Sequence, residues 1–421
     1  MRRREFATAA SALGFWLIAS STVFNLPDSK TWFSDLLSGI LLIFFSLYSL
    51  RKKSAWPLWV VTTIGLWIQF APLALWADQT WQYLNGTLCG FIAMMLSLRA
   101  LYPKEITGQP DIAPTGWSFN PSSWGPRIVM AFFALSCAFL AHYMAAFQLG
   151  FISSIWDPIF GDGTYKVVTS DVSKAFPVSD AGLGALAYTI EALTCCQGDN
   201  QRWRSMPWAA VTFGLLAVPV SIVSILLIIS QPVIVGAWCS WCLLIALLMV
   251  LMIPVALSEF VASIRFLHQS YRKKKPLWHL FWQGEHTHEK VITAVFKRQK
   301  TSFPPAGITL PWNLIASALL GLWTVFSIHF FVGVGIVADS AYVAGPLIYT
   351  IAIIAMAEVV RAARFVNILL GLGLIATVWF AEGASSLLLV HQTLLGIALI
   401  LLSLRRGPIR QRYGTWDRFI F

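Results

Sequence analysis

The fold is decided by residues 233–257, which read VIVGAWCSWCLLIALLMVLMIPVAL. The run is apolar and long enough to cross about 30 Å of hydrocarbon as a helix. It contains Cys239 and Cys242 near its start, and residues three positions apart share one helix face and can form a disulfide where the first turn is strained or frayed. Such a thiol pair can carry two electrons. The stretch therefore predicts a membrane helix and a redox site together.

The composition of the whole chain sets the class of protein. Of its 421 residues, 57% are hydrophobic and 12% are charged, and the mean hydropathy is +0.69, which excludes a soluble domain of this length. We therefore expect an all-α polytopic membrane protein with about twelve transmembrane helices. The predicted spans are 6–24, 32–50, 57–76, 80–101, 128–150, 177–194, 207–230, 233–257, 311–331, 341–360, 365–381 and 385–404, of which the sixth is short.

Basic residues collect in alternate loops between these spans. With both termini cytoplasmic, 27 of the 30 lysine and arginine residues fall inside, and only Lys30, Lys166 and Lys174 fall outside. A wrong segmentation would not easily produce this bias. The net charge of +11 therefore reflects topology, and we expect no nucleic-acid partner.

The N-terminal segment is repeated inside the chain. Its first residues could be taken for a twin-arginine secretion signal, but no Ala-x-Ala-like cleavage site follows. Instead, ASALGFW at 10–16 recurs as ASALLGLW at 316–323, with echoes at 65–67 and 371–373, and this indicates a duplicated unit. The expected organisation is a four-helix unit at 1–106, a linker at 107–126, a different four-helix bundle at 127–268, a basic cytoplasmic loop at 269–309, and a second copy of the first unit with a basic tail at 310–421.

The predicted topology places the thiol pair at the outer end of its helix, on the side where disulfides persist. Cys195 and Cys196 fall at the inner end of the sixth span, too far away to resolve a disulfide at Cys239. A zinc site is a weak rival because the outer face offers no second cysteine or histidine pair. The loop sequence EHTHE at 285–289 could bind a metal ion, although a solvated loop is the simpler interpretation, so no metal site is predicted.

Several motifs in a fixed order resemble the vitamin K epoxide reductase family, and the flanking units resemble the SPW repeat found fused to that family in bacteria. In the central unit a long outer loop leads to FPVSDAGLG at 176–184, then to Tyr188, then to RWR at 202–204, and finally to the Cys-x-x-Cys helix. The resemblance implies a four-helix bundle that reduces a membrane quinone of the ubiquinone or menaquinone type. It also implies that oxidising equivalents leave outward as a disulfide.

The resemblance also assigns roles to individual residues. Cys242 would attack and reduce the quinone, and Cys239 would exchange with an external thiol. Asp180 falls where the family uses a polar side chain to bind a quinone carbonyl, Tyr188 matches an aromatic position of the same helix, and Phe176 completes the predicted quinone-binding set. A helix N-cap is the alternative interpretation of Asp180.

Two departures from the family pattern concern the partner of Cys239. The family carries a second cysteine pair in the outer loop, but residues 151–176 contain no cysteine, and Thr164 or a near neighbour stands where one is expected. Ala246 stands where some animal members have a quinone-contacting tyrosine. The expected electron donor is therefore a small thiol or a thioredoxin-like protein outside a bacterial inner (plasma) membrane.

Three functional hypotheses remain open. The first is a quinone-linked thiol oxidoreductase embedded in membrane lipid, the second a redox sensor or scaffold without turnover, and the third a transporter or structural membrane protein on the same fold. The third lacks an obvious buried charge pair at mid-membrane. Glu191, Glu259 and Glu358 fall near inner helix ends, where snorkelling or pairing with arginine is the ordinary explanation.

Overall fold

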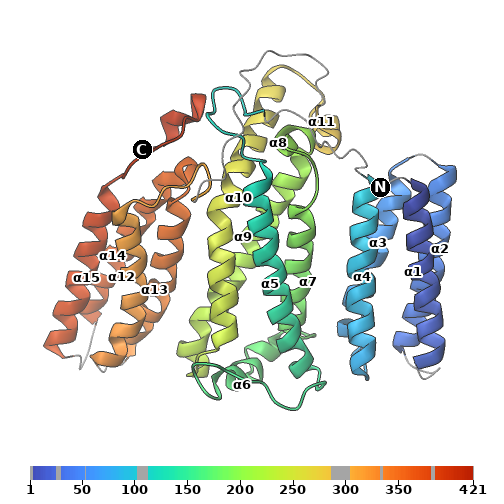
Figure 1. Ribbon diagram of the computed structural model, residues 1–421. Helices are drawn as coiled ribbons and strands as arrows, with labels where there is room; N and C mark the ends of the chain where they lie inside the picture. Colours follow the sequence, from blue (N-terminus) through green and yellow to red (C-terminus); the bar gives the residue numbers. More distant parts are fainter. Residues whose placement is uncertain are drawn as a thin grey trace. The chain divides into compact units, whose positions relative to one another are not determined.

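The protein is helical throughout the part of the chain that the structure describes, a computed structural model of residues 3–24, 30–52, 54–101, 112–285, 304–331, 335–380 and 385–420 (Figure 1). Within these ranges there are α-helices and short 3-10 and π turns but no β-strand. Eleven of the described helices are long and apolar enough to cross a membrane. The predicted all-α polytopic membrane fold is confirmed.

The chain divides into two compact units. One unit comprises Met1–Thr107 with Ala134–Gly198, and the other comprises Gly108–Phe133 with Asp199–Phe421. The described elements of the first unit are α1 (Arg3–Phe24), α2 (Lys30–Arg51), α3 (Trp56–Ala74), α4 (Thr80–Leu101), the greater part of α5 (Trp124–Gln148), α6 (Gly163–Val168) and α7 (Asp180–Cys195). Those of the second unit include α8 (Arg202–Ser205), α9 (Pro207–Ser230), α10 (Ser240–Arg272), α11 (Leu277–Gln283), α12 (Trp312–Phe330), α13 (Gly335–Ala355), α14 (Val366–Thr377) and α15 (Ser386–Leu404).

Helices α1 to α4 form two antiparallel hairpins that are held together at glycines. A Cβ atom on Gly14 would lie 2.7 Å from the carbonyl oxygen of Gly39, and the reverse distance is also 2.7 Å. Gly90 faces the carbonyl oxygen of Gly65 in the same way, at 2.6 Å. Only glycine allows these backbones to approach so closely, which is the usual role of small residues between membrane helices. The two helices of each hairpin therefore cross at one pair of glycines.

Helices α12 to α15 repeat this construction. A Cβ on Gly345 would lie 2.7 Å from the carbonyl oxygen of Gly321, and one on Gly396 would lie 2.6 Å from that of Gly371. The glycines that the sequence repeat singled out are thus the crossing points of four equivalent hairpins. This geometry supports the interpretation that residues 310–421 contain a second copy of the first unit.

In three of the four hairpins, a tryptophan lies two residues after the glycine of the first helix and makes a hydrogen bond to the neighbouring hairpin. The indole nitrogens donate to side chains of the neighbouring hairpin, in the pairs Trp16 to Asn85 (2.8 Å), Trp67 to Ser34 (3.0 Å) and Trp323 to His391 (3.0 Å). Each acceptor stands five residues before the glycine of its own helix. The fourth tryptophan position is occupied by Gly373. The repeat therefore encodes contacts between hairpins as well as within them.

Two predicted spans of the central bundle have different bounds. The span expected at 177–194 is α7, which has 16 residues and is not among the eleven long helices. The span expected at 233–257 does not begin as a helix, because the chain first makes a π turn at Gln231–Val235 and Gly236 adopts a left-handed conformation (φ 69°). Helix α10 then begins at Ser240 and continues beyond the apolar run to Arg272.

The last predicted spans also shift. The span expected at 341–360 is α13, which begins at Gly335 and ends at Ala355. A 3-10 segment at Glu358–Phe365 follows it and leads directly into α14. The polar residues of that segment accompany the earlier end of the helix: Glu358 binds the C-terminal tail, and Arg361 donates to Thr309.

Buried polar networks close one end of the second unit. Arg202 donates through Nε and Nη2 to the carboxylate of Glu259, and both side chains are almost fully buried. Glu358 accepts from the backbone nitrogens of Arg410 and Gln411 and from the hydroxyl of Tyr413. Burial raises the pKa of Tyr413 above its usual range, so its hydroxyl remains a donor. Pairing with arginine, expected for the inner glutamates, is therefore found for Glu259.

Candidate functional site

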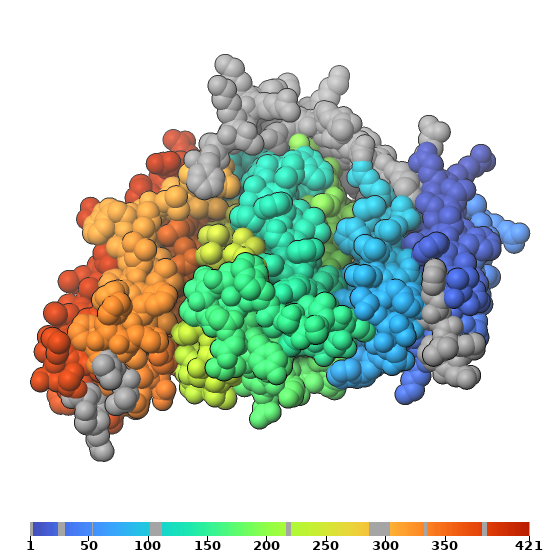
Figure 2. Space-filling view, turned by 60° about the horizontal axis from the view of Figure 1, so that its bottom comes forward, coloured from blue at the N-terminus to red at the C-terminus, as the bar shows by residue number. Residues whose placement is uncertain are grey.

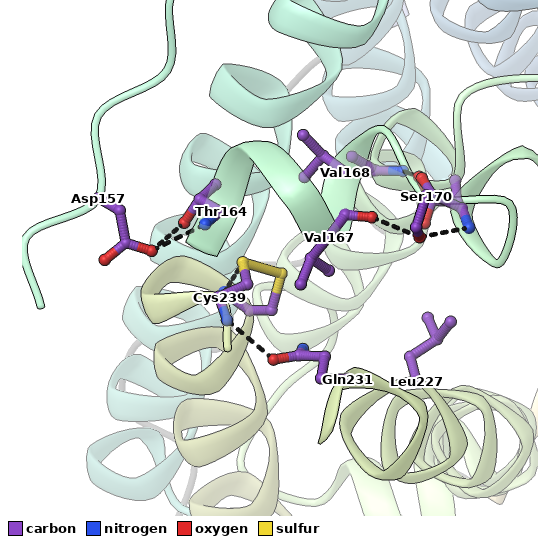
Figure 3. Close-up of a disulfide and its surroundings, with 12 residues drawn as sticks. Asp157, Thr164, Val167, Val168, Ser170, Leu227, Gln231 and Cys239 are labelled. Carbon is purple, nitrogen blue, oxygen red and sulfur yellow. Dashed lines mark hydrogen bonds between the residues drawn. A yellow bond between two sulfur atoms is a disulfide. The ribbon is translucent and has the colours of Figure 1, made fainter. Parts of the chain in front are cut away.

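The two cysteines are joined in a disulfide at the N-terminus of α10, with their Cα atoms 5.3 Å apart (Figure 3). Cys239 lies outside the helix as its N-cap, with extended backbone angles, and Cys242 lies in the first turn. The expectation that both share a helix face is therefore wrong in detail. Because Cys239 has left the helix, its Sγ can turn back and accept a hydrogen bond from the backbone nitrogen of Cys242 at 3.1 Å.

Gln231 fixes the turn that leads into the disulfide. Its Oε1 accepts from the backbone nitrogen of Cys239 at 2.9 Å, and its own carbonyl accepts from Ala237 at 3.1 Å (Figure 3). The Gln231 side chain is 1% exposed. Sequence reasoning placed a turn at Gln231 but assigned it no role, although a lone amide between two apolar runs is the signal that could have indicated one. Gln231 therefore sets where the N-cap of α10 lies.

The two sulfurs differ in exposure and share one electrostatic environment. Cys239 is fully buried and Cys242 is half-buried. The N-terminus of α10 carries partial positive charge from its free backbone N–H groups, and this stabilises a thiolate once the disulfide is reduced. The arrangement suits reversible thiol–disulfide exchange.

The residue before Cys239 contacts the C-terminal hairpins. The ring of Trp238 meets that of Tyr342 on α13 edge to face, with centroids 6.1 Å apart. Tyr342 in turn meets His329 of α12 at 6.2 Å. The turn before Cys239 is thus packed against the C-terminal hairpins in addition to being joined to α10.

Asp180 binds several groups at the N-terminal end of α7, in the other compact unit. Ser179 is the N-cap, because its Oγ accepts from the backbone nitrogen of Gly182, so the N-cap interpretation of Asp180 is wrong. Asp180 is the first helical residue, and its Oδ1 accepts from Gln148 Nε2 at 2.6 Å, from Ser173 Oγ at 2.8 Å and from the next backbone nitrogen. Asp180 therefore acts as a hydrogen-bond acceptor that joins the start of α7 to α5 and to the loop between them.

The two other predicted quinone contacts lie in the same unit as Asp180. Tyr188 follows on α7 and is 6% exposed, and Phe176 precedes the helix and is 40% exposed. The structure thus groups the five predicted site residues as two sets, with the cysteines in one compact unit and Asp180, Tyr188 and Phe176 in the other.

The loop between α5 and α7 is folded around Asp157. Its Oδ2 accepts from the backbone nitrogen and the hydroxyl of Thr164, and its Oδ1 accepts from the backbone nitrogens of Ile159 and Phe160 (Figure 3). Thr164, where the family pattern expects a cysteine, is fully buried at the start of α6. In Figure 2 this loop, drawn in green, forms a closely packed surface. Sequence reasoning missed Asp157.

The opposite face of α7 is bound to the first two hairpins. Gly182 leaves room for the Leu73 side chain of α3, and Thr189 accepts a hydrogen bond from Gln69 Nε2 at 3.0 Å. Leu193 packs with Met94 of α4. Gly182, Thr189 and Leu193 recur at helical spacing, whereas Asp180 and Tyr188 lie on the other side of α7. The first two hairpins therefore pack against one side of α7, and the predicted quinone contacts Asp180 and Tyr188 lie on the other side.

No metal site is found in the described part of the chain, because no three His, Cys, Asp or Glu side chains lie close enough together to hold an ion. Glu285 of the candidate loop motif forms an ion pair with Lys275. The rest of that motif, 286–289, lies outside the described residues.

A helical membrane bundle with a Cys-x-x-Cys disulfide at a helix terminus is typical of membrane thiol–disulfide proteins. Comparison with protein families agrees, because residues 128–257 match the family model of the vitamin K epoxide reductase family and residues 6–100 match that of the SPW repeat domain. The central segment therefore belongs to the vitamin K epoxide reductase family, and the first four helices form an SPW repeat domain. Neither curated proteins nor solved structures give a match to the chain.

Proposed function

We propose that the protein is a membrane thiol:quinone oxidoreductase in which Cys239 and Cys242 pass electrons from an external thiol to a membrane quinone. Its family indicates this activity at the coarse level of a membrane thiol/quinone oxidoreductase. The observation that supports it here is the Cys239–Cys242 disulfide at the N-terminus of α10, held by Gln231. The quinone would be of the ubiquinone or menaquinone type.

The reaction exchanges two electrons and two protons. A donor thiolate attacks Cys239 Sγ, which breaks the disulfide and leaves Cys242 as a thiolate. A second donor thiol displaces Cys239 and becomes part of the donor's own disulfide. Cys239 and Cys242 then close their disulfide again while two electrons and two protons pass to the quinone substrate, which leaves as the quinol.

The sides of the membrane follow from the same proposal. Both termini would lie in the cytoplasm of a bacterial cell, with the protein in the inner membrane and the disulfide at the outer face. The donor would be a small thiol or a thioredoxin-like protein, because residues 151–176 contain no cysteine to relay electrons. Full burial of Cys239 favours a slender donor or a local opening of the turn.

Quinone reduction by the purified protein tests the proposal. With a short-chain quinone and an added dithiol, the wild type should turn over, and Cys239→Ser and Cys242→Ser should both fall to background. Cys196→Ser is the matched control, because Cys196 is an exposed free thiol at the far end of α7, and it should turn over like the wild type.

Trapping of the donor separates the two cysteines. With the donor supplied in its disulfide form, the Cys239 thiolate of Cys242→Ser should open the donor disulfide and accumulate a mixed disulfide with it, because Cys242 is absent to release the donor, whereas Cys239→Ser should not. Turnover that survives either substitution would exclude the proposed reaction, and a mixed disulfide on Cys242 alone would reverse the two roles.

A further inference from the structure

The end of α10 and the short helix after it carry a basic and aromatic surface that the proposed reaction does not use. Arg272, the last residue of α10, is exposed, and so are Lys273 and Lys274 in the turn that follows. Helix α11 then exposes Trp278 by 76% and Trp282 by 42%. These five residues, here called the basic–aromatic surface, combine three cationic side chains with two uncovered indole rings.

Helix α11 is folded back toward the start of α9. The backbone nitrogen of Glu285 donates to the carbonyl oxygen of Arg204 at 3.0 Å, and the Glu285 carboxylate pairs with Lys275 at 2.5 Å. The ring of Trp282 meets that of Trp208, the second residue of α9, with centroids 6.1 Å apart. Figure 1 shows α11 beside α8, next to this end of α9. These contacts fix the depth of α11 relative to α9.

The start of α9 lies at the depth of the lipid headgroups. Helix α10 has 33 residues and is therefore about 50 Å long, whereas the hydrocarbon layer is about 30 Å thick. Gly214 of α9 faces Phe260 of α10, and Trp203, shortly before α9, meets Phe266 of α10 at 5.9 Å. The start of α9 is thus level with a point about 30–40 Å along α10, just outside the hydrocarbon layer. Because Trp282 contacts this point, α11 lies at the membrane surface.

The backbone of Lys274 gives a separate reason to assign its side chain a role. Lys274 adopts a left-handed conformation (φ 55°), and its backbone nitrogen donates to the carbonyl oxygen of Tyr271 at 2.9 Å to close the end of α10. Glycine or asparagine usually fills such a position, because other residues are strained there. The chain therefore keeps a cationic side chain where the backbone would be better served by glycine, and such strain is often found at functional positions.

We propose that the basic–aromatic surface binds anionic phospholipid of the surrounding membrane. Trp278 and Trp282 would lie among the headgroups, where indole rings are favoured because one edge is polar and the rest apolar. Arg272, Lys273 and Lys274 would bind the headgroup phosphates and supply the preference for anionic lipid. Apolar burial and positive charge together give stable attachment to a lipid surface. Lipid is the occupant that fits, because the surface lies at headgroup depth and matches headgroups in charge.

Lipid retention by the purified full-length protein tests the charged part of this surface. In native mass spectrometry, the wild type should retain phosphatidylglycerol in preference to phosphatidylcholine. Lys274→Gly should lower the affinity for phosphatidylglycerol about fivefold, the weight of one basic residue beside an anionic surface. Its melting temperature should stay equal or rise, because glycine adopts the left-handed turn without strain. The control Lys174→Gln removes an exposed lysine from the loop before α7 and should match the wild type.

This pair of measurements separates lipid binding from a structural role. A structural role for Lys274 would lower the melting temperature together with lipid retention, whereas the proposal requires the two to change independently. Equal phosphatidylglycerol affinity in Lys274→Gly and the wild type would overturn the inference.

Thiol labelling tests the aromatic part. In a Cys196→Ser background, Trp278→Cys and His279→Cys replace two neighbouring exposed side chains of α11. In liposomes, a water-soluble maleimide should label Trp278→Cys several times more slowly than His279→Cys, because lipid covers the face that carries the tryptophans. Equal rates would show that this face meets water, and slow labelling only at high protein-to-lipid ratios would indicate a second copy of the chain. Either result overturns the inference and leaves the proposed function untouched, because neither test uses quinone turnover.

Discussion

Single residues outside the sequence motif determine the geometry of the disulfide. The Cys-x-x-Cys spacing predicts a pair of thiols near a helix terminus, but the structure shows that a buried side chain eight residues earlier defines that terminus. Gln231 Oε1 accepts from the Cys239 backbone nitrogen, which would otherwise be a buried donor without a partner. The redox pair therefore depends on an amide that the motif does not include.

Removal of this amide should be costly. In Gln231→Leu the Cys239 N–H loses its acceptor while the packing volume is kept, and we expect a loss of about 1–3 kcal/mol of stability. Thermal unfolding in detergent measures the effect, with the exposed Val233→Ala as a control from the same turn. An unchanged melting temperature in Gln231→Leu would show that the turn is held by other contacts.

At the scale of secondary-structure elements, the four hairpins show why glycine spacing matters more than hydrophobicity. Every predicted span is apolar, yet only certain glycines sit at a crossing. Gly371 and Gly373 are two residues apart on α14, but a Cβ on Gly371 would lie 2.8 Å from the carbonyl oxygen of Gly396, whereas one on Gly373 would meet nothing within 4 Å. The same substitution at the two positions should therefore have different effects.

Gly371→Ala should destabilise the C-terminal hairpin by about 1–3 kcal/mol, the usual cost of overpacking. Gly373→Ala should be neutral or slightly stabilising, because alanine favours the helix and has free space there. Melting temperatures of the two variants under one set of conditions measure the difference. Equal melting temperatures would contradict close packing at Gly371.

The sequence predicts the elements well where hydrophobic length decides and less well where local backbone chemistry decides. The bounds of α4 and α9 coincide with the predicted spans. The start of α10 was missed because Pro232 and Gly236 favour a π turn inside an apolar run, and hydropathy does not detect this. Asp157 and Gln231 were missed because their roles depend on backbone groups that become neighbours only after folding.

At the scale of the whole molecule, the N-terminal hairpins and the C-terminal hairpins each contact an element that carries predicted site residues. The first two hairpins bind the back of α7 through Gln69, Leu73 and Met94, and the C-terminal hairpins contact Trp238 beside the disulfide through Tyr342. The N-terminal hairpins thus pack against α7, and the C-terminal hairpins pack against the turn before α10.

A substitution in the first unit should therefore change quinone chemistry in the central bundle. Gln69→Leu removes the only side-chain hydrogen bond found between Gln69 and α7 in the described structure, and Thr189 loses a buried donor. We expect KM for quinone to rise about three- to tenfold because α7 is less firmly held, while the donor reduces the Cys239–Cys242 disulfide at the wild-type rate. Thr63→Ala, an exposed position on the same helix, is the matched control. If Gln69→Leu slowed disulfide reduction and quinone reduction equally, the first unit would act on the stability of the whole protein and not on α7.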